Sequence, residues 1–225
     1  MTVTYQVLNM TNGGGSENLL INPRGKINQA NESDGVLSAG QYFCDGWKAG
    51  AAGAEVYRDA DGFRLISGSI LQLVPNNLDI GRTIKGNMDT VLGTPAIRIN
   101  GGTDSELSDD QPYITFEVFG NNSKFSRLIL SESEDLPIYQ QSADELTPCL
   151  PFFKVLEQVH IDSTEIGEYE SIPFSKMFGV PAVSATRQAF YNDVTLHGVS
   201  STAVVMRSIT TVPAWTESLI LDGRL

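Results

Sequence analysis

The stretch YITFEVF, residues 113–119, alternates apolar side chains with threonine and glutamate. Alternation with a period of two is typical of a β-strand that has one buried and one exposed face. The turn residues GNNS, 120–123, follow, and residues 124–130 give a second run of the same kind. The pattern predicts a β-hairpin with a four-residue loop and a chain built from antiparallel strands.

Short strand-like runs recur through the rest of the chain. We expect further strands at residues 55–57, 63–66, 69–74, 96–99, 182–189, 194–199, 203–209 and 217–221. One helix start is recognisable, at residues 142–146, and Pro148 and Pro151 would keep that helix short. Many short strands without alternating helices predict an all-β antiparallel sandwich.

Two composition changes divide the chain. The run NGGGS, residues 12–16, is typical of a flexible joint, so we expect residues 1–17 to form a separate arm that is a candidate anchor. A polar stretch at 131–135 ends the first series of strands. We therefore expect a sandwich domain at 18–138 and a smaller β domain at 139–225, which gains burial from the first domain or from sister chains.

The net charge of −12 gives a surface that repels phosphate backbones and anionic lipid. Nucleic acid is therefore not an expected partner. No run of eighteen apolar residues occurs, so membrane insertion is not expected either. Cys44 and Cys149 are the only cysteines, and we interpret them as buried small side chains in preference to a disulfide.

The sequence offers little catalytic chemistry. His160 and His197 lie in separate strand-like runs, without a second histidine or a cysteine at zinc-binding spacing. The chain lacks the G-x-S-x-G, P-loop and G-x-G-x-x-G motifs. Acidic residues in polar loops leave a glycan hydrolase as an alternative, but solvated carboxylates are common in an acidic protein. We predict a protein that is not an enzyme and needs no cofactor.

Two sets of residues are candidates for binding. Asp59 and Asp61 precede Gly62 as in part of a calcium loop, but Ile70 stands where an EF-hand needs glutamate. A tight Asp-Gly turn is the preferred interpretation, with a calcium clamp as the alternative. Tyrosine side chains can stack on sugars, and the candidates for glycan binding are Tyr57, Tyr113 and Tyr139. We expect Trp47 to pack in the core.

Several segments carry a family likeness. The run NLLIN at 18–22, continued by Gln29, resembles the opening of bacteriophage tail-fibre and minor virion proteins. That opening is followed in the family by a tyrosine and Asp-Arg-Trp, for which this chain has Tyr42 and Asp45-Gly46-Trp47. Three later segments follow in the family's order, namely DELTPCLPFF at 144–153, similar to E-L-x-x-C-Q-R-Y-Y, IPFSKMFGVPAV at 172–183, and ESLILD at 217–222. Two arginines of the family pattern are missing, which puts any salt bridge that they make in doubt.

The resemblance implies a carbohydrate-binding-module-like jelly roll followed by a small β domain. It also implies a non-enzymatic structural protein of the virion, made in the host bacterial cytoplasm and often trimeric. Such a protein would act as tail fibre, head fibre or capsid decoration, with other virion proteins and host surface glycans as partners. The alternatives are a free-standing carbohydrate-binding module and, third, a glycan depolymerase. We expect Leu19-Leu20-Ile21 to be a short strand that starts the sandwich, with Trp47 packed inside it.

Overall fold

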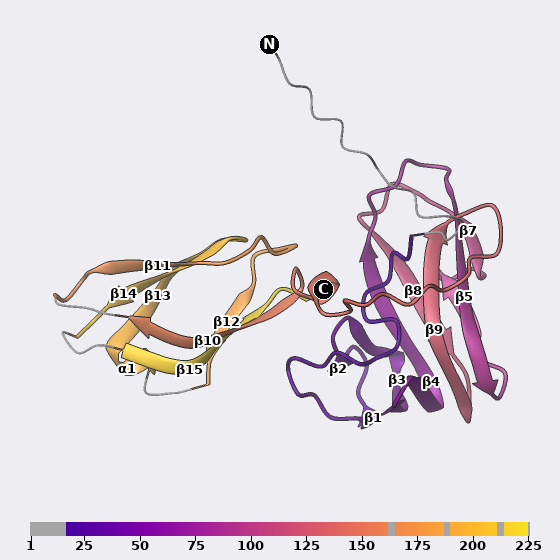
Figure 1. The fold of residues 1–225 in the computed structure, drawn as a ribbon, viewed down its shortest axis with the longest axis horizontal. Helices are drawn as coiled ribbons and strands as arrows, with labels where there is room; N and C mark the ends of the chain where they lie inside the picture. Colours follow the sequence, from indigo (N-terminus) through magenta and orange to yellow (C-terminus); the bar gives the residue numbers. More distant parts are fainter. Residues whose placement is uncertain (1–16, 162–164, 187–189, 211–213, 225) are drawn as a thin grey trace, which may run out of the picture.

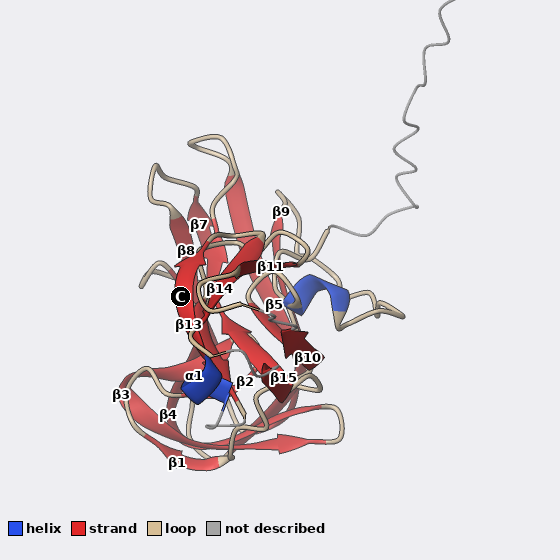
Figure 2. Ribbon diagram, turned by 90° about the vertical axis from the view of Figure 1, so that its left-hand side faces the viewer, coloured by secondary structure: helices blue, strands red, loops and turns tan. Residues whose placement is uncertain are grey.

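The computed structural model describes residues 17–161, 165–186, 190–210 and 214–224. Over these ranges the chain is all-β, as predicted, and its paired strands are antiparallel (Figure 1). The helical segments are short, a 3₁₀ turn at Thr147–Cys149 and α1 at Phe190–Asp193 (Figure 2). The predicted arm, residues 1–17, lies outside the described residues apart from Glu17.

The first unit is a nine-stranded sheet that folds into two layers. Its strands are β1 (Gly35–Leu37), β2 (Tyr42–Cys44), β3 (Trp47–Asp59), β4 (Gly62–Pro75), β5 (Thr83–Leu92), β6 (Ala96–Ile99), β7 (Ser105–Leu107), β8 (Tyr113–Phe119) and β9 (Ser123–Glu132). In one layer, the start of β3 pairs with β2 and with the end of β4. The end of β4 also pairs with β8, and β8 pairs with β6. The end of β3 and the start of β4 belong to the other layer, with β1, β9, β5 and β7. The result is a jelly-roll-like sandwich.

Glycines bend the two strands that both layers share. Residues 50–53 of β3 bulge out between Ala49, which pairs with Ile70, and Ala54, which pairs with Gly68. Gly68 has a φ of +83°, and a Cβ there would lie 2.3 Å from the carbonyl oxygen of Gly53. Only glycine allows the backbones to approach this closely with a positive φ.

The core of the first unit lies between the layers and is rich in aromatic residues. The rings of Phe43, Trp47, Phe116 and Phe125 are fully or almost fully buried around Phe63. Trp47 and Phe63 have ring centroids 5.3 Å apart. The prediction that Trp47 belongs to the core is confirmed.

The predicted hairpin at residues 113–130 is wrong, although both of its strands exist. β8 pairs with Ser69–Pro75 of β4, whereas β9 pairs with Phe63–Leu65 of the same strand and with β5. The loop between β8 and β9 therefore crosses from one layer to the other. Alternation revealed the strands, but it carries no information on which strand each of them joins.

The opening segment is also not a strand, in contrast to the prediction for residues 19–21. Its backbone is held by one backbone hydrogen bond, from the amide of Leu19 to the carbonyl oxygen of Leu130 at 2.8 Å, and by side chains. Asn18 Oδ1 accepts hydrogen bonds from the amides of Leu20 and Leu130, at 3.1 Å each, and Gln72 bonds both the amide and the carbonyl of Ile21. Leu20 is nevertheless buried in the core, so the segment closes the sandwich without extending a sheet.

In its described residues, the second unit has two three-stranded sheets that enclose a smaller core. One sheet has the order β10 (Phe153–Ile161), β15 (Ala214–Asp222), β12 (Ala182–Ala185), and the other has β11 (Tyr169–Pro173), β14 (Ala203–Ser208), β13 (Val194–Val199). Phe190, Val204, Met206 and Leu219 are fully buried between them. Residues 142–146 do not begin an α-helix: Asp144 accepts backbone hydrogen bonds from a turn that continues only as the 3₁₀ turn Thr147–Cys149.

Candidate functional site

The two units meet at a polar junction that brings together segments far apart in the sequence. We define the junction by residues that form hydrogen bonds, ion pairs or ring contacts where the units meet, namely Asn22, Arg24, Gln29, Glu32, Tyr42, Asp45, Asp61, Glu145, Phe153, Asp222 and Arg224. Figure 1 shows the C-terminal end of the chain between the two units.

Arg24 makes the first ionic link. Its guanidinium is buried, and its Nε donates a hydrogen bond to Oε1 of Glu145 at 2.7 Å. Its Nη2 donates to the same oxygen. Nη1 donates to Oδ1 of Asp61 at 3.0 Å. Burial alone would lower the pKa of Arg24, but the hydrogen bond and the charge of Glu145 outweigh it, so the pKa is raised. The arginine therefore stays charged while it joins the first unit to the segment that leads into the second.

A second link runs through the buried carboxylate of Asp45. Gln29 donates to it twice, from its amide at 2.8 Å and from Nε2 at 2.6 Å. The same Nε2 donates to the carbonyl oxygen of Phe153, at the start of β10, at 3.0 Å. Asn22 bonds the carbonyl oxygen of Asp45, and Trp47 Nε1 donates to the carbonyl oxygen of Asn22. One polar network thus ties the aromatic core of the first unit to the second unit.

Arg224 makes the third link, directly after β15. Nη1 donates to Glu32 of the first unit at 2.7 Å, and Nε and Nη2 bond both carboxylate oxygens of Asp222 at 2.9 and 2.7 Å. The guanidinium lies 4.4 Å from the ring centroid of Tyr42 and 4.6 Å from that of Phe153. Two aromatic faces, one from each unit, therefore surround this cation.

Glu32 is the junction residue whose carboxylate is only partly hydrogen-bonded. Its Oε1 accepts from Arg224, but its Oε2 is buried and has no hydrogen-bond partner among the described residues. Burial raises the pKa of Glu32 even though the charge of Arg224 opposes this shift. The ionised carboxylate is thus held in place at an energetic cost.

The three tyrosines predicted to bind glycans do not form one site. Tyr57 lies on β3 and its hydroxyl donates to Oε1 of Glu55 at 3.2 Å. Tyr113 lies at the start of β8, with its ring centroid 6.0 Å from that of Phe178 in the second unit. Tyr139 is half-buried beside Arg24, and burial raises its pKa. Tyr113 therefore belongs to the contact between the units, and Tyr139 lies near the charged groups of the junction.

The candidate calcium residues face cations of the chain itself. Asp59 pairs with Lys124 at 2.7 Å. Asp61 pairs with Arg24 at 3.0 Å and lies 3.6 Å from Arg127. A calcium ion would have to displace these side chains. Across the part of the chain that the structure describes, no three His, Cys, Asp or Glu side chains group as metal ligands.

The remaining predicted features are placed as follows. Cys44 and Cys149 are free and buried, as predicted, and burial raises the pKa of both thiols. His160 lies on β10 and His197 on β13, where the latter contacts the ring of Tyr169. No helix in the described ranges is long and apolar enough to cross a membrane.

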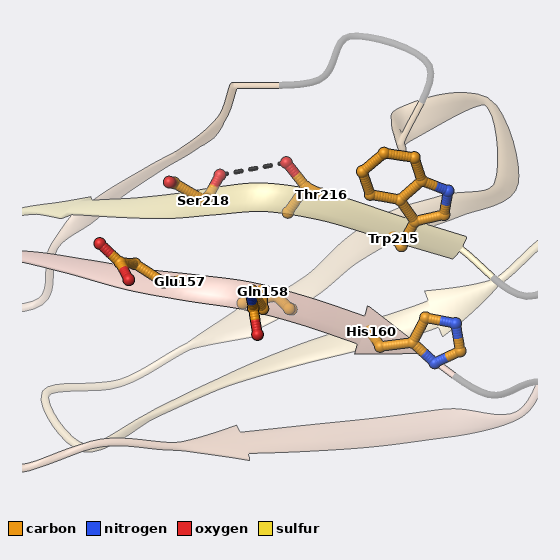
Figure 3. A pocket seen from close by; sticks show the side chains of 7 residues that line it. Glu157, Gln158, His160, Trp215, Thr216 and Ser218 are labelled. Carbon is orange, nitrogen blue, oxygen red and sulfur yellow. Dashed lines mark hydrogen bonds between the residues drawn. The ribbon is translucent and has the colours of Figure 1, made fainter.

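A hollow of about 620 Å³ in the second unit was not predicted from the sequence (Figure 3). It lies on the β10–β15 strand pair and is lined by Glu157, Gln158, Val159, His160, Trp215, Thr216 and Ser218. A second hollow, of about 490 Å³, lies in the first unit beside Arg98, whose guanidinium covers the ring of Phe119 at 3.9 Å. The first is the better candidate site because an exposed indole and several polar groups converge on it.

Searches of protein-family models, of curated proteins and of solved structures found no match to this chain.

Proposed function

We propose that the chain is a non-enzymatic structural protein of a bacteriophage particle, as a tail fibre, head fibre or capsid decoration, and that it contacts host surface glycans. Its partners are then other virion proteins and further copies of the same chain, with a trimer as the expected assembly. Neither nucleic acid nor membrane insertion enters this proposal, because the net charge of −12 opposes binding to phosphate-rich partners.

One observation carries the proposal: the segments that resemble phage tail-fibre proteins meet at the junction. Asn22 and Gln29 come from the NLLIN opening, Asp45 from the Asp-Gly-Trp segment, and Glu145 and Phe153 from the segment at 144–153. Two links of the junction join residues more than a hundred positions apart, Arg24 with Glu145 and Gln29 with Phe153. A resemblance that rests on separate short segments supports the proposal more strongly when those segments contact one another in the structure.

The junction also suits a mechanical role. Ionic and aromatic contacts fix one β unit against the other, which is the property that a particle appendage needs to present a binding surface at a defined orientation. Weak contacts with glycans would be sufficient on a particle, since repeated copies add avidity.

The first test is incorporation into particles. Purified virions from cells that express the tagged chain should contain it, as detected by mass spectrometry and by gold-labelled antibody. A variant without residues 1–16 should fail to be incorporated if these residues are the anchor. Absence of the full chain from particles would contradict the proposal.

The second test concerns assembly and the competing functions. Light scattering at several concentrations should give about three times the chain mass of 24.4 kDa. Glycan binding without release of reducing ends would argue against a depolymerase. A stable monomer that binds glycans and is absent from particles would favour a free-standing carbohydrate-binding module.

A further inference from the structure

The hollow lies on the β10–β15 strand pair, where four of its seven lining residues are exposed and two, Val159 and Thr216, are buried. The cross-strand pairs His160–Trp215 and Glu157–Ser218 both line it. Figure 3 shows the indole of Trp215 at one end of the hollow and Glu157 and Ser218 toward the other. A volume of about 620 Å³ falls in the range of sites for small ligands, roughly 300 to 1,000 Å³.

Gln158 produces this arrangement through its backbone. Its φ is +54°, which residues other than glycine seldom adopt. Leu156, which precedes Gln158, and Val159, which follows it, both pack in the core although they are three positions apart. The face of β10 that is buried therefore changes at Gln158. In a regular strand Glu157 and His160, three positions apart, would point to opposite faces. The local twist brings both to the same hollow.

An uncommon backbone conformation has a free-energy cost, and such residues cluster at binding and catalytic sites. In the described part of the chain, the side chains of Glu157 and Gln158 form no hydrogen bond or ion pair. Both are exposed at the hollow. Their carboxylate and amide are therefore available to a ligand, whereas the exposed carboxylates of Asp59, Asp89 and Glu132 in the first unit pair with cations of the chain.

Trp215 gives the hollow its apolar surface. Trp215 is 45% exposed, whereas Trp47, the other tryptophan, is completely buried. The face of an indole carries partial negative charge and attracts the C–H bonds on the apolar face of a sugar ring. An exposed indole bordered by hydrogen-bonding groups suits a ligand that has one apolar face and a polar rim.

We propose that this hollow binds a pyranose ring of an uncharged oligosaccharide, stacked on Trp215 and hydrogen-bonded by Glu157 and Gln158. The carboxylate accepts from sugar hydroxyls, and the amide both donates and accepts. The negative charge of Glu157 and of the whole chain disfavours acidic sugars. This assignment rests on the proposed function, because it names the place at which the protein contacts host glycans.

Tryptophan fluorescence tests the site directly in the full-length protein. Acrylamide quenches exposed indoles, so the quenching reports Trp215 and not the buried Trp47. The protein is titrated with maltohexaose, cellohexaose and chitohexaose, and with hexagalacturonate as the acidic comparison. At least one uncharged hexasaccharide should protect Trp215 from acrylamide, and hexagalacturonate should not.

Variants separate the contributions of the lining residues, with affinity measured by calorimetry. Trp215→Ala should weaken binding at least tenfold, and Trp215→Tyr should retain part of it. Gln158→Gly removes the amide but suits a positive φ, so it should keep the fold and weaken binding about fivefold. Tyr169→Ala is the matched control, because Tyr169 is an exposed aromatic residue on the other sheet of the same unit. Its affinity should equal that of the wild type.

The outcomes distinguish this assignment from the proposed function. Equal affinity of the wild type and both Trp215→Ala and Gln158→Gly would overturn the site while glycan contact elsewhere remained possible. Failure of every uncharged hexasaccharide to bind would also overturn it. Sugar binding that depends on Trp215, by a protein absent from purified phage particles, would support the site and contradict the proposed function.

Discussion

Arg224 combines two roles at the level of a single residue, since it pairs with carboxylates and fills the space between two aromatic rings. We expect Arg224→Ala to lower the free energy of unfolding by about 3 kcal/mol, because it leaves Glu32 buried without its cation. Arg224→Lys keeps the charge but loses the planar fork, so its effect should be smaller. Urea unfolding measures both values.

Arg58→Ala is the control for this prediction. Arg58 pairs with Asp34 at 2.6 Å, but both side chains are more exposed than that of Arg224. Partly exposed ion pairs contribute little, so the loss should be below about 1 kcal/mol. An equal loss of unfolding free energy in Arg58→Ala and Arg224→Ala would contradict the prediction for Arg224.

Glu32 makes stability depend on pH in a defined direction. Its pKa is raised above the ordinary value of 4.5, so the folded state binds this proton more tightly than the unfolded state does. Protonation therefore favours folding, and this contribution is lost as pH rises through the folded pKa. As pH falls toward 4.5, the wild type should gain stability relative to Glu32→Gln. Urea unfolding of both proteins across this pH range gives the difference in their free energies of unfolding. A difference that does not change with pH would show that Glu32 is not responsible.

At the level of elements, the sandwich depends on the bend shared by β3 and β4. Gly68→Ala should cost about 3 kcal/mol or more, because a Cβ would lie 2.3 Å from a backbone oxygen in addition to the unfavourable φ. Gly81→Ala is the matched control: its φ is +84°, but the space around it is open. It should cost only about 1 kcal/mol. Thermal unfolding of the two variants separates steric clash from backbone strain.

Element types were predictable from the sequence wherever alternation was regular, as in β8, whose buried residues are Ile114, Phe116 and Val118. Of β10, only the strand-like surroundings of His160 were recognised and no strand range was predicted, because the core face changes at Gln158 and breaks the alternation. The segment at 63–74 was expected as two strands but is the single bent strand β4. Pairing partners were not predictable, since they depend on contacts between residues far apart.

The candidate site was less predictable than the fold, for a related reason. The sequence cannot distinguish an aromatic residue that is buried from one that is exposed when both lie in strand-like runs. Tyr113 and Tyr139 were candidates for sugar stacking, yet Tyr113 contacts Phe178 of the second unit and Tyr139 is half-buried near Arg24. Trp215, next to the predicted strand at 217–221, was overlooked because only the folded second unit reveals its exposure.

For the whole molecule, the junction should make the two units unfold together. Trp47 reports on the first unit and Trp215 on the second, and a Trp215→Phe background assigns the two fluorescence signals. In the wild type both signals should change at one urea concentration. Arg24→Ala removes the links to Glu145 and Asp61, so the second unit, which has the smaller core, should unfold first. Coincident transitions in Arg24→Ala would show that the links made by Arg24 are not needed to couple the units.

The ion pair of Glu32 and Arg224 spans 192 positions of the sequence. A ribosome therefore makes Glu32 long before its partner, and the first unit can fold while the junction is still open. Translation through Arg224 supplies the third link of the junction. A chain that stops before Arg224 would lack this link and keep those of Arg24 with Glu145 and Gln29 with Phe153. The ion pair is thus a late contact of the junction, formed after the links of Arg24 with Glu145 and of Gln29 with Phe153 can form.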